Sequence, residues 1–251
     1  MKPPVAVVLA AGQGTRMKSD LPKVLCPVLG RPMIHFVIDA LAAAGVERVI
    51  AVVGYRADDV KRELAGRKNV EFALQMERLG TGHAVKMARG QLAEHEGPVI
   101  VVAGDSPLLQ KKTVAALLDH FYGSRPACLL GTLLKDDPQG LGRIVRDGQG
   151  EFQGIVEEKD ATLPQRQIKE VNMSTYFFDC RELLHALDLL KNDNRQGEFY
   201  LTDGPGILKR EGKRVQALPI LQPCEALSIN MPEELAVVEA EMRRLGYEAA
   251  L

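Results

Sequence analysis

The sequence Leu9-Ala-Ala-Gly12-Gln-Gly14-Thr15-Arg16-Met17, followed by Leu21-Pro22-Lys23-Val24-Leu25, decides the fold that we expect for this chain. It comes directly after an apolar run at residues 5–8, which is typical of a buried β-strand. In an open α/β sheet, ligands bind at the carboxyl ends of the strands. The glycine-rich turn therefore predicts both a fold class and the position of a ligand site.

This turn has the features of a polyphosphate site. Gly12 and Gly14 lack a Cβ atom, so the backbone can adopt φ > 0 there and its N–H groups can approach an anion closely. Arg16 and Lys23 add two positive charges to the segment. The alternative is that the two glycines only form a tight turn. The nucleotide P-loop string is absent, and Met17 stands where the dinucleotide fingerprint needs a third glycine.

Length and composition favour one large α/β domain or one domain with an appended lobe. The chain has 251 residues, 46% of them hydrophobic, and a net charge of −1. This charge argues against a non-specific nucleic-acid binder, and no apolar run approaches the length of a membrane span. The four cysteines are scattered without a C-x-x-C pair, and no signal peptide precedes the first strand. We therefore expect a cytoplasmic protein with no nucleic-acid or membrane partner.

Apolar runs predict further strands, with helical periodicity between most of them. These runs lie at residues 49–53, 70–75, 99–103, 128–134, 171–178 and 215–218. Strand–helix–strand units of this spacing form right-handed crossovers between parallel strands. The pattern changes after residue 135, where a long turn and a hairpin strand at 154–159 predict a small lobe over the sheet.

A second glycine-rich turn, Leu79-Gly80-Thr81-Gly82-His83, follows Gln75. The amide of Gln75 offers both a donor and an acceptor, as the edge of uracil does, and Gly80 would let the backbone approach a base. The alternative is an exposed glutamine before an ordinary turn. His83 has no evident partner in the sequence, and we interpret it as a structural residue.

The strand at 99–103 ends in Gly104-Asp105-Ser106-Pro107. A carboxylate at the carboxyl end of a central strand, beside a phosphate loop, suits Mg²⁺, which is held by one or two carboxylates plus substrate phosphates. The alternative is that Asp105 only caps the turn before Pro107.

The motifs L-A-A-G-x-G-T-R-M and L-P-K-V-L resemble those of the sugar-nucleotidyltransferase family. Within it, the chain is most similar to the uridylyltransferase half of the bifunctional enzyme that makes UDP-N-acetylglucosamine, and the similarity covers nearly the whole chain. It implies an α/β fold with a Rossmann-like mixed, mostly parallel sheet flanked by helices. We expect a single domain over 1–251, with a nucleotide-binding part at 1–135 and the sugar-binding lobe and C-terminal elements at 136–251. Hexapeptide repeats are absent, so we expect no left-handed β-helix acetyltransferase domain.

The resemblance also implies a reaction and its residues. The reaction is Mg²⁺-dependent transfer of UMP from UTP to N-acetylglucosamine 1-phosphate, with release of pyrophosphate. Arg16 and Lys23 would be catalytic, and Asp105 and Asn230 would hold the metal. The implied nucleotide-binding residues are Leu9, Ala10, Ala11, Gly12, Gly14, Gln75, Gly80, Thr81 and Gly104. The implied sugar-binding residues are Ala103, Gly142, Glu157 and Asn172.

The chain departs from the family pattern at three places. Ala103 stands where an aromatic residue is usual, and Met231 replaces a polar neighbour of Asn230. Asn172-Met173-Ser174 replaces Asn-Thr-Gly or Asn-Ala-Gly, so we expect a less permissive backbone there. Asn230 has the alternative role of capping the last helix.

Two rival functions remain open at this stage. One is a related enzyme that uses CTP, GTP or dTTP, or another sugar or polyol phosphate. The other is a catalytically weak protein that binds nucleotide sugars.

Overall fold

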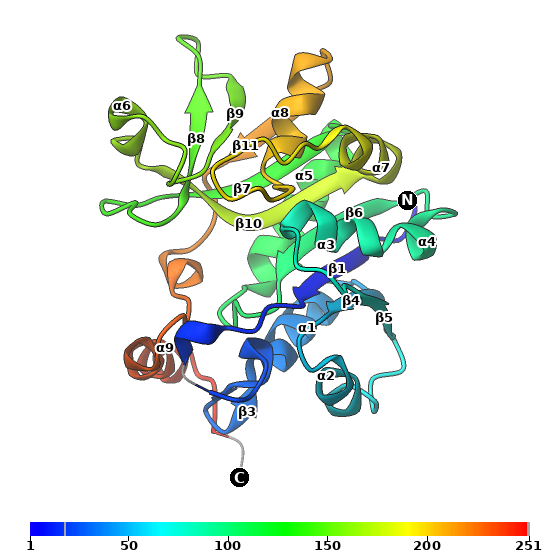
Figure 1. Cartoon of the computed structure of the whole chain (residues 1–251), viewed down its shortest axis with the longest axis vertical. Helices are drawn as coiled ribbons and strands as arrows, with labels where there is room; N and C mark the ends of the chain where they lie inside the picture. Colours follow the sequence, from blue (N-terminus) through cyan, green and yellow to red (C-terminus); the bar gives the residue numbers. More distant parts are fainter. Residues whose placement is uncertain (18, 250–251) are drawn as a thin grey trace.

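The computed structural model describes residues 1–17 and 19–249, and its centre is a nine-stranded mixed sheet (Figure 1). The strand order is β11-β7-β10-β6-β1-β4-β5, and β8 and β9 extend the sheet from β10. Along the main order only β10 runs antiparallel to its neighbours. The strands are β1 (Val5–Ala10), β4 (Arg48–Val53), β5 (Val70–Leu74), β6 (Pro98–Ala103), β7 (Cys128–Leu134), β8 (Gly142–Arg146), β9 (Phe152–Val156), β10 (Glu170–Asp179) and β11 (Val215–Leu218), with a separate hairpin of β2 (Pro27–Val28) and β3 (Arg31–Pro32).

Helices cover both faces of the sheet because alternate strand residues point to opposite sides. Val5 and Val7 of β1 pack with α3, α4, α7 and α8, whereas Ala6 and Val8 pack with α1, α2 and α5. The helices are α1 (Met33–Ala43), α2 (Ala57–Glu63), α3 (Thr81–Met87), α4 (Arg89–Leu92), α5 (Lys111–Ser124), α6 (Leu163–Arg166), α7 (Cys180–Leu189), α8 (Asp203–Arg210) and α9 (Pro232–Arg244). Short 3₁₀ turns are η1 (Thr15–Met17), η2 (Lys23–Leu25) and η3 (Pro223–Ala226). The expected mixed, mostly parallel sheet between helices is confirmed.

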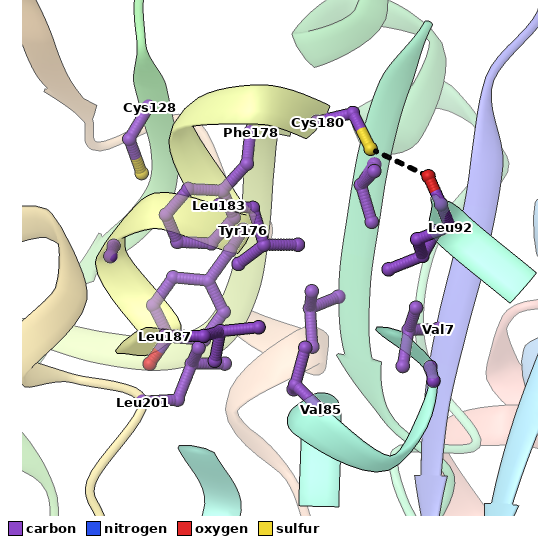
Figure 2. Packing of buried hydrophobic residues seen from close by; sticks show 14 of the residues in the cluster. Val7, Val85, Leu92, Cys128, Tyr176, Phe178, Cys180, Leu183, Leu187 and Leu201 are labelled. Atoms are coloured by element: carbon purple, nitrogen blue, oxygen red, sulfur yellow. Dashed lines mark hydrogen bonds between the residues drawn. The ribbon is translucent and has the colours of Figure 1, made fainter. Parts of the chain in front are cut away.

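Part of the core on one face lies between α7 and β10 (Figure 2). Tyr176 and Phe178 stack with their ring centroids 6.0 Å apart, and both point toward Leu183 and Leu187 of the helix. The thiol of Cys180 donates a hydrogen bond to a main-chain carbonyl at the end of α4 (3.5 Å). This packing fixes β10, which comes from residues 136–251, between two strands from residues 1–135.

A third apolar cluster joins the start of the chain to its end. Met17 of the first glycine-rich loop and Val28 of the short hairpin pack with Ile229 and with Val238 and Met242 of α9. Because burial of such side chains is the main favourable term in folding, this cluster fixes the segment before α9 against the loop after β1. Across residues 1–17 and 19–249, the structure contains no helix with the length and apolar character needed to cross a bilayer.

The strand β10 is bent by an irregularity in its pairing with β7 between Asn172 and Thr175. Ser174 lies within this bulge and adopts φ = +53°, in the left-handed region that favours glycine. The family pattern that this chain resembles has a glycine at this position, where the backbone conformation favours one. The serine of this chain allows fewer backbone conformations there, as we expected.

We expect Ser174→Gly to be more stable than Ser174→Ala by about 1 kcal/mol. A Cβ atom in the left-handed region costs about 1–2 kcal/mol, and the extra freedom of glycine in the unfolded chain offsets part of this gain. Both variants lack the serine hydroxyl, so their difference isolates the backbone effect. Urea unfolding gives the two free energies, and an alanine variant as stable as the glycine variant would contradict the strain.

Candidate functional site

The loops after β1 and β6 lie side by side, since these parallel strands end at the same edge of the sheet. The N–H group of Gly104 donates to the carbonyl of Leu9 at 2.9 Å. A Cβ atom on Gly104 would lie 2.9 Å from that carbonyl oxygen, so a larger residue would push the two loops apart. Gly104 therefore has a packing role at this edge.

Gly12 and Gly14 of the first loop have different structural roles. Gly14 has φ = +66°, and a Cβ atom there would lie 2.6 Å from the Cβ of Lys23. Gly14 thus lets Lys23 pack directly against the loop. Gly12 does not adopt a positive φ, although a glycine permits one. A Cβ on Gly12 would meet no atom within 4 Å, because Gly12 lines a cavity.

The side chains of Arg16, Lys23, Asp105 and Asn230, all expected in the site, form one cluster centred on the Lys23 ammonium group. The Nζ atom of Lys23 lies 2.5 Å from Oδ2 of Asp105 and donates to Oδ1 of Asn230 at 2.8 Å. Arg16 donates a longer hydrogen bond to the same Asn230 oxygen, at 3.4 Å. The Lys23 side chain is 14% exposed and that of Asp105 is 26% exposed, so water screens this pair only in part.

The helix-capping alternative for Asn230 does not match the contacts. Glu234 caps the start of α9, because its Oε2 atom accepts from the N–H groups of Asn230 (2.5 Å) and Met231 (3.1 Å). The Asn230 side chain turns away, and its Nδ2 atom donates to Ser228 (2.8 Å). Within the described residues, the Asp105 carboxylate accepts no hydrogen bond from a backbone N–H, which removes the turn-cap alternative as well.

The same two oxygen atoms make a suitable cation site. Asp105 and Asn230 already direct a carboxylate and an amide oxygen at one positive charge. Hard divalent cations prefer such oxygen ligands, and Mg²⁺ takes few of them from the protein. No cluster of three or more His, Cys, Asp or Glu side chains suited to a metal occurs in the described part of the chain. A cation here would complete its coordination with water or substrate oxygens.

A cavity of about 330 Å³ lies between the first and second glycine-rich turns. Six of the expected nucleotide-binding residues line it: Leu9, Ala11, Gly12, Gln75, Gly80 and Thr81. Ala10, by contrast, is buried in the core on the α1 side of the sheet. Gly80 has φ = +105°, and a Cβ atom there would lie 2.6 Å from the carbonyl oxygen of Phe199. Only glycine fits at this turn.

Gln75 is buried. This excludes the alternative that it is an exposed glutamine before an ordinary turn. Its Nε2 atom lies 3.2 Å from the carbonyl oxygen of Gly80 and 3.0 Å from Nδ1 of His83. The expectation that His83 has no partner is therefore wrong, because its ring contacts the amide of Gln75.

A larger cavity, of about 620 Å³, meets the first at a shared wall. Lys23, Ala103, Asp105 and Ser174 line both cavities. The larger one also contains Arg16, Asn230 and Asn172. The cluster around Lys23 therefore lies where the two cavities join.

Gly142, Glu157 and Asn172 come together beside the larger cavity, although only Asn172 lines it. Gly142 pairs with Asn172 in the β8–β10 register, and a Cβ on Gly142 would lie 3.6 Å from the Glu157 carboxylate. Asn172 is held by two contacts: its Nδ2 atom donates to the Tyr176 hydroxyl (2.7 Å), and its Oδ1 atom accepts from the Ser174 N–H (3.2 Å).

Buried Arg143 fixes the loop that closes this side. It donates to the Glu158 carboxylate at 2.7 Å and to the carbonyl of Leu141, while Gly140 donates its N–H to the same carboxylate at 3.2 Å. Gly140 and Leu141 line the larger cavity. Arg143 therefore shapes the cavity wall without itself lining the cavity.

Two carboxyl groups near this wall titrate unusually. Burial raises the pKa of Glu157, and the hydrogen bond from the Thr202 hydroxyl (2.9 Å) opposes this rise. Burial, reinforced by the charge of Glu157, raises the pKa of Asp203 to about 6. At neutral pH the carboxylates of Glu157 and Asp203 therefore repel each other in the folded protein.

Sequence reasoning missed two charged residues of the smaller cavity, Arg78 and Glu198. Arg78 precedes the second glycine-rich turn, and its charge was the available signal. Glu198 reaches the cavity because the segment around it pairs with that turn: Phe199 donates its N–H to Leu79, and Leu201 donates its N–H to the Thr81 hydroxyl. No local pattern encodes this pairing.

We expect the stability of Asp203→Asn relative to the parent protein to rise between about pH 4 and pH 7. An aspartate has a pKa near 3.9 in an unfolded chain, so the folded parent binds more protons in this window and loses stability as pH rises. Asparagine has no such loss. Urea unfolding at pH 4.5 and 7.5 checks this, with Asp58→Asn on exposed α2 as the control. A difference from the parent that stays constant with pH would contradict the raised pKa.

Comparisons with known proteins identify the family of this chain. Residues 6–198 match the model of the MobA-like NTP transferase domain. The chain is 48% identical to the bifunctional protein GlmU of Geobacillus thermodenitrificans over 236 residues, which cover 94% of this chain and 50% of that protein. It is 45% identical to GlmU of Listeria monocytogenes serotype 4a over 235 residues, with the same two coverages.

A solved structure shares the fold at low sequence identity. It is UDP-glucose pyrophosphorylase complexed with UDP-glucose, which superposes with a TM-score of 0.77 at 15% identity over 97% of this chain and 99% of the other. The chain spans about half the length of the curated relatives it matches. The family match covers most of the sheet and both glycine-rich turns, and the chain therefore belongs to the MobA-like NTP transferase domain family.

Proposed function

We propose that this chain is a sugar-1-phosphate uridylyltransferase. It transfers UMP from UTP to N-acetylglucosamine 1-phosphate and gives UDP-N-acetylglucosamine and pyrophosphate. The observation that carries the proposal is the convergence of Arg16, Lys23, Asp105 and Asn230 where the two cavities meet. The relatives named GlmU support the choice of reaction.

The proposed reaction requires that the two substrates are aligned and that the charge on their phosphates is neutralised. An oxygen of the sugar phosphate attacks the α-phosphorus of UTP, a new O–P bond forms, and the bond to the β-phosphate oxygen breaks. The attacking oxygen is already ionised at neutral pH, so no general base is needed. Arg16 and the loop N–H groups hold the β- and γ-phosphates, and Lys23 contacts phosphate oxygens at the reacting centre. Binding in line and neutralising charge supply the rate enhancement.

Mg²⁺ is the proposed cofactor, with Asp105 and Asn230 as its protein ligands. Their oxygen atoms converge on one cationic group, which is the donor set that this ion prefers. When bound, the ion neutralises phosphate charge and favours departure of pyrophosphate. The release of Lys23 from these oxygens would leave its ammonium free to contact phosphate.

The two cavities divide the substrates. The smaller cavity, with Gln75, Gly80 and Thr81, takes the uridine, and the backbone of the loop at residues 9–14 faces the phosphates. The larger cavity takes the sugar phosphate beside Asn172, with Gly142 and Glu157 behind it and Ala103 on the shared wall.

Residues 1–135 thus form the nucleotide-binding part of one nucleotidyltransferase domain, and residues 136–251 provide the sugar side and the C-terminal elements. UTP and a sugar 1-phosphate are the proposed partners, and the cytoplasm, which holds such soluble phosphates, is the proposed location.

Pyrophosphate release from a panel of substrates tests the function. The panel pairs UTP, CTP, GTP and dTTP with the 1-phosphates of N-acetylglucosamine, N-acetylgalactosamine, glucosamine and glucose. We expect the highest kcat/KM for UTP with N-acetylglucosamine 1-phosphate, and no turnover in excess chelator. Another best pair would correct the substrates while keeping the reaction. Nucleotide binding without pyrophosphate from any pair would favour a binding protein, and full turnover with chelator would reject the metal.

We expect Lys23→Ala to lower kcat/KM by on the order of 10²-fold, because one fixed positive charge at the reacting phosphates is lost. The matched control is Lys61→Ala, which removes a lysine from the exposed face of α2. Thermal unfolding of both variants separates a loss of catalysis from a loss of folding. A folded Lys23→Ala protein with turnover near that of the control would reject the assignment.

A further inference from the structure

The amide of Gln75 has both of its hydrogen atoms occupied. Its Nε2 atom faces the Gly80 carbonyl oxygen at 3.2 Å and the His83 Nδ1 atom at 3.0 Å, and the side chain is 4% exposed. An amide nitrogen has two hydrogens, so these two acceptors use its full donor capacity.

The hydrogen-bond network assigns the orientation of this amide. A carbonyl oxygen cannot donate, so the amide nitrogen and not its oxygen must face Gly80. The nitrogen that faces His83 then requires an acceptor, and Nδ1 accepts only when it carries no proton. His83 is therefore the neutral tautomer with its proton on Nε2.

The remaining amide atom is a fixed acceptor on the wall of the smaller cavity. Among the described residues, no protein group donates to Oε1 of Gln75. Uracil joined to ribose has a single ring donor, the N3–H group, whereas N3 of cytosine is an acceptor. Opposite a fixed carbonyl oxygen, uracil forms a hydrogen bond and cytosine in the same position meets a second lone pair.

We propose that His83 is a positioning residue for base selection: its unprotonated Nδ1 holds the Gln75 amide so that Oε1 faces the base and favours uracil over cytosine. The inference rests on the proposed function, which places uridine in this cavity. It goes further because it assigns selectivity to a side chain of α3 that does not itself line the cavity.

Two variants of similar shape separate this role from simple packing. Asparagine can place its Oδ1 atom near the position of Nδ1 and keeps the acceptor, whereas leucine has a similar branched outline and no acceptor. We expect His83→Leu to lower the ratio of kcat/KM for UTP to that for CTP by about tenfold, the value of one lost neutral hydrogen bond. We expect His83→Asn to keep the ratio within about threefold of the parent protein.

A packing role would change the two substrates alike. If His83→Leu lowers kcat/KM for UTP and CTP by the same factor, the inference is overturned while the proposed function survives. If the parent protein itself does not prefer UTP, the proposed choice of UTP and this inference both fail, whereas the nucleotidyl-transfer reaction is kept.

The tautomer provides a second measurement that needs no turnover. Nitrogen-15 NMR of the labelled parent protein should show Nδ1 of His83 without a proton and Nε2 with one, and the assignment is checked by loss of the signal in His83→Leu. A proton on Nδ1 in the folded protein at neutral pH would overturn the inference directly.

Discussion

The contact between the Lys23 ammonium and the oxygens of Asp105 and Asn230 is the interaction on which the rest of the site depends. It joins the loop after β1, the end of β6 and the segment before α9. Its formation needs Gly14, because a side chain there would displace Lys23. Together with Arg16, these groups carry one more positive than negative charge, which suits the polyphosphate that we propose for the junction of the two cavities.

The polar site is held in place by apolar packing. Tyr176 has its ring in the core beneath α7 (Figure 2). Its hydroxyl accepts a hydrogen bond from Asn172, so the core fixes the position of a proposed sugar ligand. Ser174 completes this arrangement by donating its N–H to the same Asn172 side chain, at the cost of a left-handed backbone. The same bulge therefore strains the backbone of Ser174 and holds the Asn172 side chain in place.

The sequence predicts those structural features that depend on residues close together in the chain. Apolar runs such as residues 5–8 and 49–53 identify buried strands, since parallel strands are covered on both faces. The insertion of β10 between β6 and β7 depends on pairing between distant segments, which periodicity does not encode. The expectation that Asn230 belongs to the same site as Lys23 came from family resemblance alone, and their direct contact was not predicted. The contact between Gln75 and His83 was missed although it is local, because it depends on the φ of +105° at Gly80.

The shared wall between the cavities has a consequence for specificity. Gln75 lines only the smaller cavity and Asn172 only the larger one, so under the proposed assignment a change at either residue acts on one substrate. Ala103 lines both, and a bulky side chain there would narrow both at once. In a close-packed protein such a change cannot be absorbed on one side alone. If the proposed substrates occupy the two cavities, Ala103 therefore couples the fit of nucleotide and sugar phosphate, whereas the direction of the Gln75 amide affects only the proposed base.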